Sequence, residues 1–190
     1  MNETHAIRLC LKYKDPSGFE FLVKKYRREA YVHAIGFLGN PDDAADACQE
    51  SFSRAFSKMP LLEGMTEFYP WFYTILRNYC LNAIKRHKTV STHRQSQTQS
   101  DLDSAASYDP RLIISGDEEK TLVWQVLESL TPEFREILIL KYIQGYSYDD
   151  IATLSAIPRG TVMSRLYHAR KAFSQNYDSG SVQKCHGHSS

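Results

Sequence analysis

The sequence predicts an all-α protein of two small helical domains joined by a flexible linker. Apolar residues recur at spacings of three and four in several separate stretches, which is typical of amphipathic helices. Residues 89–107 interrupt this pattern with a polar composition that cannot bury enough apolar surface to order the chain. A helix-turn-helix pattern then follows. We expect a lead-in at 1–18, domains at 19–88 and 117–173, a linker at 89–116 and a disordered tail at 174–190.

Composition narrows the classes of protein that fit. The 190 residues carry a net charge of only +1, so any nucleic acid must be recognised through local patches. The 4 cysteines form no CxxC pair, and the chain begins without a signal-peptide apolar core. No apolar run approaches the length of a membrane span. These features favour a cytoplasmic protein without membrane contact of its own.

The first domain is predicted to begin with a helix from Phe19 that ends at Gly39-Asn40-Pro41. A second helix over 42–58 presents an inward stripe, which we assign to Ala45, Cys48, Phe52, Ala55 and Phe56. An outward polar face carries Asp42, Asp46, Gln49, Glu50 and Ser53. Acids in a first turn stabilise the helix dipole. The face could equally dock a basic partner, and the residues alone leave both interpretations open.

An aromatic-rich helix is predicted from Phe68 to about His87. Phe68 and Phe72 belong to its core side, whereas spacing alone leaves open whether Tyr69, Trp71 and Tyr73 pack the domain or face outward. A second stripe combines Asn78, Asn82 and Lys85. Amides beside aromatic and basic side chains are what unstacked DNA bases require, namely hydrogen-bonding groups, stacking surfaces and a positive track along the phosphates.

The second domain is predicted to start near Asp117 with a helix over 122–130. Thr131-Pro132 then opens a helix that runs to Gln144, and Gly145 stops it. A capping box of Ser147 and Asp150 begins the helix-turn-helix.

The second helix of that motif carries the residues expected to face DNA. Ile157-Pro158 breaks the first helix, so the second begins near Arg159. It buries Val162, Leu166, Ala169 and Phe173. Its other side chains include arginines and a lysine but no acidic residue. A helix of this size fits the major groove of DNA. A solvated basic helix closing a bundle is the alternative.

These residues together carry a resemblance to a known family. Residues 43–52, Trp71 to Asn78, Leu130 to Glu136 and Gly160 to Leu166 resemble, in the same order, the conserved stretches of extracytoplasmic-function (ECF) sigma factors of the sigma-70 family. The resemblance covers about 120 of the 190 residues. It implies a non-enzymatic factor, without cofactor or metal, that binds the clamp and flap of core RNA polymerase and promoter DNA, and that an anti-sigma factor regulates.

The resemblance also assigns roles to residues. For the acidic face of residues 42–56 it implies docking on polymerase rather than stabilisation of the helix alone. The side chains implied to dock on polymerase are Asp43, Asp46, Gln49, Glu50 and Phe52. Those implied to hold the minus-ten strand are Tyr69, Trp71, Tyr73, Arg77, Asn78, Asn82, Lys85 and Arg86. Those implied to read the minus-thirty-five duplex are Arg159, Thr161, Met163, Ser164, Arg165, Tyr167, His168, Arg170 and Lys171.

Two other classes of protein are alternatives to a sigma factor. A helix-turn-helix regulator without sigma activity remains the alternative, and the lack of a sensor domain argues against it. An enzyme is disfavoured, because the sequence shows no paired carboxylates, nucleophile elbow, phosphate-binding glycine loop or spaced metal ligands. Cys185, His186 and His188 provide too few ligands for a closed zinc site.

Overall fold

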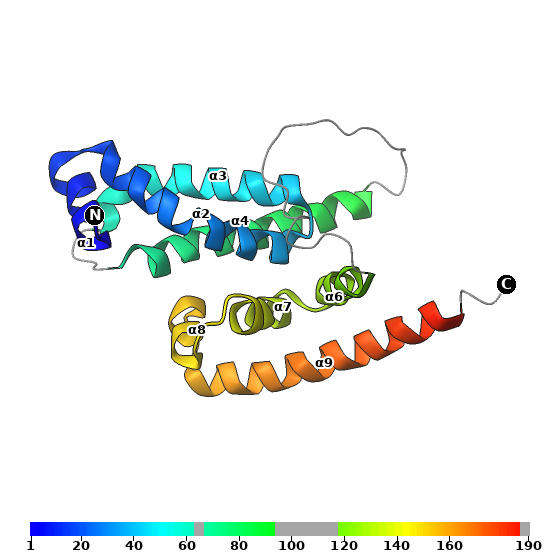
Figure 1. Ribbon diagram of the computed structural model, residues 1–190. Coiled ribbons are helices and arrows are strands. Elements are labelled where there is room, and N and C mark those ends of the chain that lie inside the picture. The colour runs from blue at the N-terminus through cyan, green and yellow to red at the C-terminus, as the bar shows by residue number, and fades with distance from the viewer. Residues whose placement is uncertain (63–66, 94–117, 187–190) are drawn as a thin grey trace.

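The computed structural model describes residues 1–62, 67–93 and 118–186, and in this part of the chain every element is a helix. The predicted all-α fold is therefore confirmed. Figure 1 shows two layers, with the N-terminal helices above and α6 to α9 below. The predicted linker falls mostly on residues 94–117, outside the described residues.

The upper layer begins with a folded N-terminal segment rather than a simple lead-in. Ala6 and Ile7 are buried, and their helix packs against α2. α2 starts three residues before the predicted Phe19, because Asp15 caps it by accepting from Ser17 N at 2.9 Å and Pro16 occupies its first turn. The elements are α1 (Glu3–Arg8), the π-helical turn η1 (Leu9–Tyr13), α2 (Pro16–Leu38), α3 (Pro41–Ser57), the 3₁₀ turn η2 (Met59–Leu62) and α4 (Phe68–His93).

Local signals place the helices of the lower layer where the sequence predicts them. Thr131 caps α7, Gly145 adopts a left-handed φ of 78°, and Ser147 forms the predicted capping box with Asp150. α8 ends before Ile157-Pro158, at Ala156, which takes a left-handed φ of 53°. The elements are α6 (Glu118–Ser129), α7 (Pro132–Leu138), the π-helical turn η3 (Ile139–Ile143), α8 (Tyr148–Ser155) and α9 (Arg159–His186).

The predicted disordered tail is wrong for residues 174–186, which continue α9; residues 187–190 lie outside the described chain. The extension has its own contacts. Phe173 stacks on Tyr177 one turn later, with ring centroids 6.0 Å apart, and Asn176 Nδ2 donates to Ser129 Oγ of α6 at 2.8 Å. Packing along α6 thus compensates for a polar composition that by itself suggested disorder.

The two layers pack directly on each other. α2 contacts α6 and α7, and α4 contacts α8. At one contact between the layers a Cβ on Gly36 would lie 2.5 Å from Ile139 Cδ1, so the glycine leaves room for the Ile139 side chain. Beside it, Arg135 of α7 donates through Nη1 to the carbonyl oxygen of Phe37 at 2.5 Å. The two predicted domains therefore share a buried interface.

Candidate functional site

The acidic face of α3 is accessible over most of its length. Asn40 caps the helix, accepting from the backbone nitrogens of Asp42 and Asp43 at 2.8 and 3.1 Å. Asp46 and Gln49 are exposed. Glu50 is half-exposed and pairs with Arg54 Nε at 2.7 Å. The face is thus available to a partner.

The predicted inward stripe of α3 is rotated relative to the structure. Ala45 is exposed and Phe56 is 55% exposed, whereas Ala44, Ala47 and Ser51 are buried against the neighbouring helices. A face of small residues lets α2 and α4 approach closely, and alanine periodicity gives little indication of which alanines are buried.

Phe52 lies on the inward side of α3, as its spacing predicted, and not on the docking face that the resemblance implied for it. It is 8% exposed and stacks on Phe72, with ring centroids 4.2 Å apart. Its contribution in this structure is to the aromatic core between α3 and α4.

Five of the eight proposed minus-ten residues lie along an open face of α4. Asn78, Asn82, Lys85 and Arg86 are exposed, and Trp71 is half-buried with an edge contact to Phe68 at 5.8 Å. The guanidinium of Arg86 lies over the Tyr79 ring at 5.7 Å. Positively charged side chains, amides and an aromatic ring therefore lie together on one accessible face.

The other three, Tyr69, Tyr73 and the half-buried Arg77, lie where the layers meet. Tyr69 is 5% exposed and stacks on Tyr26 at 4.8 Å, and Tyr73 is fully buried. The Tyr73 hydroxyl donates to Glu136 Oε1 of α7 at 2.8 Å, and burial raises the Tyr73 pKa. Arg77 donates to the same carboxylate. The sequence left Tyr69 and Tyr73 open between packing and DNA contact, and in this arrangement they pack.

The second helix of the helix-turn-helix presents its predicted residues to solvent. Val162, Leu166 and Ala169 are buried as predicted. Arg159 pairs with Asp149 Oδ1 of α8 at 3.1 Å, and both side chains are largely exposed. Thr161 and Arg165 are half-buried, and the remaining predicted contacts are exposed: Arg159, Met163, Ser164, Tyr167, His168, Arg170 and Lys171.

Sequence reasoning missed the polar residues at the interface between the layers. His33 is fully buried, with Nδ1 3.4 Å from Gln144 Oε1, and burial lowers its pKa to about 4. Arg135 is 9% exposed and donates to the carbonyls of Leu127, Leu130 and Phe37. Glu136 is 2% exposed. Two adjacent charges within the apolar run of α7 were the available signal, but the sequence did not reveal their partners.

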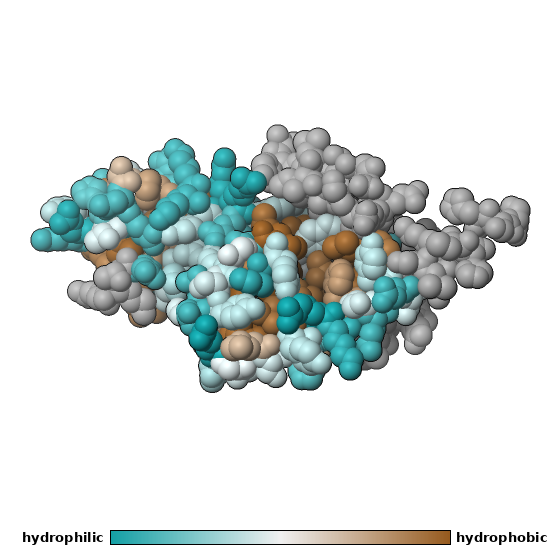
Figure 2. Space-filling view, turned by 60° about the horizontal axis from the view of Figure 1, so that its bottom comes forward, coloured by the Kyte–Doolittle hydropathy of each residue, from teal (hydrophilic) through white to brown (hydrophobic). Residues whose placement is uncertain are grey.

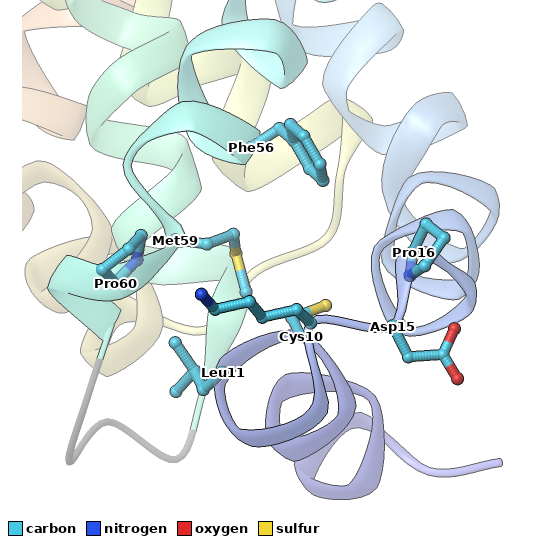
Figure 3. Close-up of a pocket in the computed structure, with 8 residues that line it drawn as sticks. Cys10, Leu11, Asp15, Pro16, Phe56, Met59 and Pro60 are labelled. Atoms are coloured by element: carbon cyan, nitrogen blue, oxygen red, sulfur yellow. The ribbon is translucent and has the colours of Figure 1, made fainter.

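Two of the surface hollows are lined largely by apolar side chains. One is a cavity of about 360 Å³ near the N-terminal helices. Figure 3 shows Cys10 and Leu11 on one side of it and Phe56, Met59 and Pro60 on the other. Burial raises the pKa of the Cys10 thiol, which suits a packing role better than a reactive one. The other is an apolar groove of about 300 Å³ in the lower layer; Figure 2 shows apolar side chains gathered on the face seen from that side. The groove is lined by Val123, Leu127, Leu138, Tyr142, Ile143, Arg170 and Phe173.

Neither a metal site nor a membrane span occurs within the described residues. Groups of three or more potential metal ligands do not come together there. No helix in that part of the chain is long and apolar enough to cross a bilayer. The side chains of Cys185 and His186, and all of His188, lie outside what the structure describes.

Comparison with known families identifies both layers. The model of sigma-70 region 2 matches residues 22–90, and that of sigma-70 region 4 matches residues 120–173. The chain belongs to the sigma-70 family. We therefore call the helices α2 to α4 region 2 and the helices α6 to α9 region 4.

Curated relatives are ECF-type sigma factors. The chain is 29% identical over 168 residues to the RNA polymerase sigma-H factor of Pseudomonas aeruginosa, covering 83% of this chain and 85% of that protein. It is 26% identical over 168 residues, with the same coverage, to the ECF RNA polymerase sigma-E factor of Escherichia coli strain K12.

Solved structures share the fold over most of the chain. CnrH in complex with the cytosolic domain of CnrY superimposes with a TM-score of 0.68 at 17% identity, covering 94% of this chain and 99% of that one. The sigma factor RpoE of Bartonella quintana, in complex with the anti-sigma factor NepR, gives a TM-score of 0.64 at 21% identity, covering 84% and 96%.

Family membership establishes the general function of the chain. Sigma factors bind core RNA polymerase and direct it to promoters; they are transcription initiation factors, not enzymes. This sigma factor thus acts in promoter-specific initiation, and the alternative of a regulator without sigma activity is not supported.

Proposed function

We propose that the exposed acidic face of α3 docks this sigma factor on the clamp of the largest polymerase subunit. The exposed side chains of Asp46 and Gln49, with the half-buried Asp43 and Glu50 beside them, support this assignment. Opposite charges across such an interface speed association and fix its orientation. Phe52 supports the face from the core and does not itself touch the partner.

The exposed stripe of α4 is proposed to bind the minus-ten element. The stripe supplies amides from Asn78 and Asn82 and positive charge from Lys85 and Arg86, and Trp71 offers an aromatic edge. Stacking and phosphate contacts of this kind hold a melted strand. Arg77 joins the set once it is released from Glu136.

For the minus-thirty-five element, α9 is the proposed reading helix. The exposed side chains from Arg159 to Lys171 lie on the side of α9 that faces away from α6, α7 and α8, and none of them is acidic. Arginine and lysine bind phosphates and guanine edges in the major groove. Met163 and Tyr167 supply the apolar contacts available on this face.

The polymerase flap is the proposed occupant of the apolar groove of region 4. Its lining by Val123, Leu138 and Phe173, with Tyr142 at the rim, suits the apolar face of a short segment. The superimposed sigma factors were solved with the anti-sigma factor NepR and with the cytosolic domain of CnrY. A partner of that kind is accordingly proposed to regulate this chain. Because polymerase and promoters are cytoplasmic, the chain is proposed to act there, and catalysis belongs to polymerase.

The observation that carries this proposal is the match of both sigma regions to two domains whose predicted contact helices expose most of their assigned side chains. The test is run-off transcription with bacterial core polymerase and a library of promoter-length DNA. Asp46→Arg should weaken core binding by about tenfold, because it reverses charge at the docking face. Arg165→Ala should reduce initiation without changing core binding.

Matched controls are Glu20→Arg and Arg8→Ala, which make the same chemical changes at exposed sites of α2 and α1. Both should initiate like the wild type. Duplex binding that depends on Arg165, without initiation or core binding, would instead establish the regulator alternative.

A further inference from the structure

Glu136 of region 4 is bound at the point where region 2 is expected to hold DNA. Arg77 donates to it through Nε at 2.5 Å and through Nη2 at 3.0 Å, one bond to each carboxylate oxygen. The Tyr73 hydroxyl adds a third bond at 2.8 Å. The Glu136 side chain is 2% exposed and that of Arg77 25% exposed.

The chemistry of this contact is that of a phosphate site. The planar guanidinium binds carboxylate and phosphate groups with the same two-point geometry, and a hydroxyl donor suits either anion. Arg77 lies on α4 directly before the exposed Asn78. A DNA phosphate therefore cannot bind the Nε–Nη2 edge of Arg77 while the Glu136 carboxylate occupies it.

Packing around Glu136 shows that the contact belongs to a built interface. The Tyr73 ring meets His33 edge-on at 4.7 Å, and His33 in turn lies 4.9 Å from Phe37. Gly36 leaves the space that Ile139 fills. Next to Glu136, Arg135 reaches across to the Phe37 carbonyl. Apolar contact and directed hydrogen bonds thus hold the two regions together on both sides of the carboxylate.

We propose that Glu136 competes with the minus-ten strand for Arg77 and Tyr73, so that region 4 blocks part of the DNA-binding face of region 2 in the free sigma factor. The carboxylate acts as an internal substitute for a DNA phosphate. Docking on polymerase separates the regions and exposes Arg77. This inference rests on the proposed role of Arg77 in minus-ten binding.

The first experiment uses the full chain without polymerase. Glu136→Gln keeps the shape of the side chain but removes the charge that binds Arg77. We expect a larger radius of gyration by small-angle X-ray scattering. We also expect about tenfold tighter binding of a fluorescein-labelled single strand of mixed sequence, because apparent affinity scales with the fraction of competent molecules.

The matched control is Glu133→Gln, an equal change of charge at an exposed position of the same helix. Glu133 contributes least among the groups that raise the Arg77 pKa, after Glu136 and Tyr73. It should leave both the radius of gyration and the strand affinity at their wild-type values. A Glu136→Gln chain as compact as the wild type, with unchanged strand affinity, overturns the proposal.

A second variant locks the interface. Both γ carbons of Ile139 lie within reach of a Cβ on residue 36, at 3.0 and 3.5 Å, so cysteines at 36 and 139 are placed to form a disulfide. Gly36→Cys/Ile139→Cys should give no run-off transcript when oxidised and recover on reduction, while each single change responds to neither treatment. Equal transcription by the oxidised and reduced forms overturns the proposal.

The two experiments distinguish an error in this inference from an error in the proposed function. Scattering requires neither polymerase nor promoter, so it reports the closed arrangement by itself. If the wild-type chain fails to bind core polymerase, the proposed function fails, whatever the scattering shows. If the wild type initiates normally and Glu136→Gln remains compact, only the competition by Glu136 fails.

Discussion

The two helices proposed to contact DNA, α4 and α9, differ in how much of their predicted contact surface is open. On α9 most assigned side chains are exposed, including Tyr167 at 58% and Met163 at 51%. On α4 the assigned set is divided: Asn78 and Asn82 are exposed, while Tyr73 is fully buried against region 4.

This difference arises from what covers each helix. α9 packs on α6, α7 and α8 along one stripe only and leaves its basic side to solvent. α4 lies between the rest of region 2 and the helices of region 4. The proposed DNA-contact faces of α4 and α9 have similar residue types but differ in exposure to solvent. The face of α4 becomes fully exposed only when the two regions separate.

The largest expected effect tests whether the aromatic side of α4 is core. Phe72→Ala removes a fully buried ring that stacks on Phe52 at 4.2 Å and Phe68 at 5.4 Å. We expect a loss of about 3–5 kcal/mol in the free energy of unfolding, measured in urea. Tyr167→Ala on α9 should change it by less than about 0.5 kcal/mol. Equal losses would mean that the two helices do not differ in burial.

A second test uses pH, because His33 lies behind Tyr73 on the buried side of the interface. The pKa of His33 is lowered from 6.5 to about 4 by burial, against a smaller opposing effect of Glu136. Above pH 6.5 both folded and unfolded chains hold it neutral. As the pH falls from 6.5 toward 4, only the unfolded chain takes up the proton, so stability decreases.

The expected loss is about 2 kcal/mol between pH 7 and pH 5, measured by urea unfolding. His33→Gln should abolish this component, whereas His168→Gln on the exposed side of α9 should retain it. The same pH dependence in all three chains would show that the interior of the interface is hydrated.

A smaller effect compares two left-handed glycines. Gly39 and Gly145 have φ values of 71° and 78°. A Cβ at Gly39 would lie 2.0 Å from Glu128 Oε1 of region 4, whereas nothing lies within 4 Å at Gly145. Gly145→Ala should cost about 1 kcal/mol of backbone strain. Gly39→Ala should cost about 2 kcal/mol, because Glu128 must also move. Identical costs by urea unfolding would place Glu128 away from Gly39 in solution.

The smallest effect concerns phosphate contacts by α9. Lys171→Ala should lower the slope of log affinity against log salt for duplex DNA by about one, as expected when one phosphate contact is lost. Arg77→Gln should leave that slope unchanged in the free chain, because Arg77 is bound to Glu136. Fluorescence anisotropy over a salt series measures both. A reduced slope for Arg77→Gln would show that α4 already contacts duplex DNA without polymerase.

Local chemistry made much of the fold predictable. The Ser147–Asp150 capping box, the Thr131 cap and the positive φ of Gly145 were expected because each depends on residues within one turn of the helix end. The stripe of Val162, Leu166 and Ala169 was expected because a long helix with bulky apolar residues has a clear inner face. The exposed basic side of α9 followed from the same periodicity.

Predictions failed where the deciding contact lay far along the chain. Alanine spacing in α3 could not distinguish Ala44 from Ala45, since the packing of α2 and α4 decides which is buried. The length of α9 depended on its contact with α6, through Asn176 and Ser129. The division of the minus-ten set depended on Glu136, 59 positions after Arg77.

The sequence by itself determined most of the helices, the ends that carry capping signals, the order of the two sigma regions and the residue types available for polymerase and DNA. These features rest on hydrogen bonds and periodicity within a few residues. Only the tertiary structure decided which of those residues are free to act. Burial of Tyr73, pairing of Arg77 with Glu136 and neutralisation of His33 require two domains to meet, and no local pattern specifies where they do.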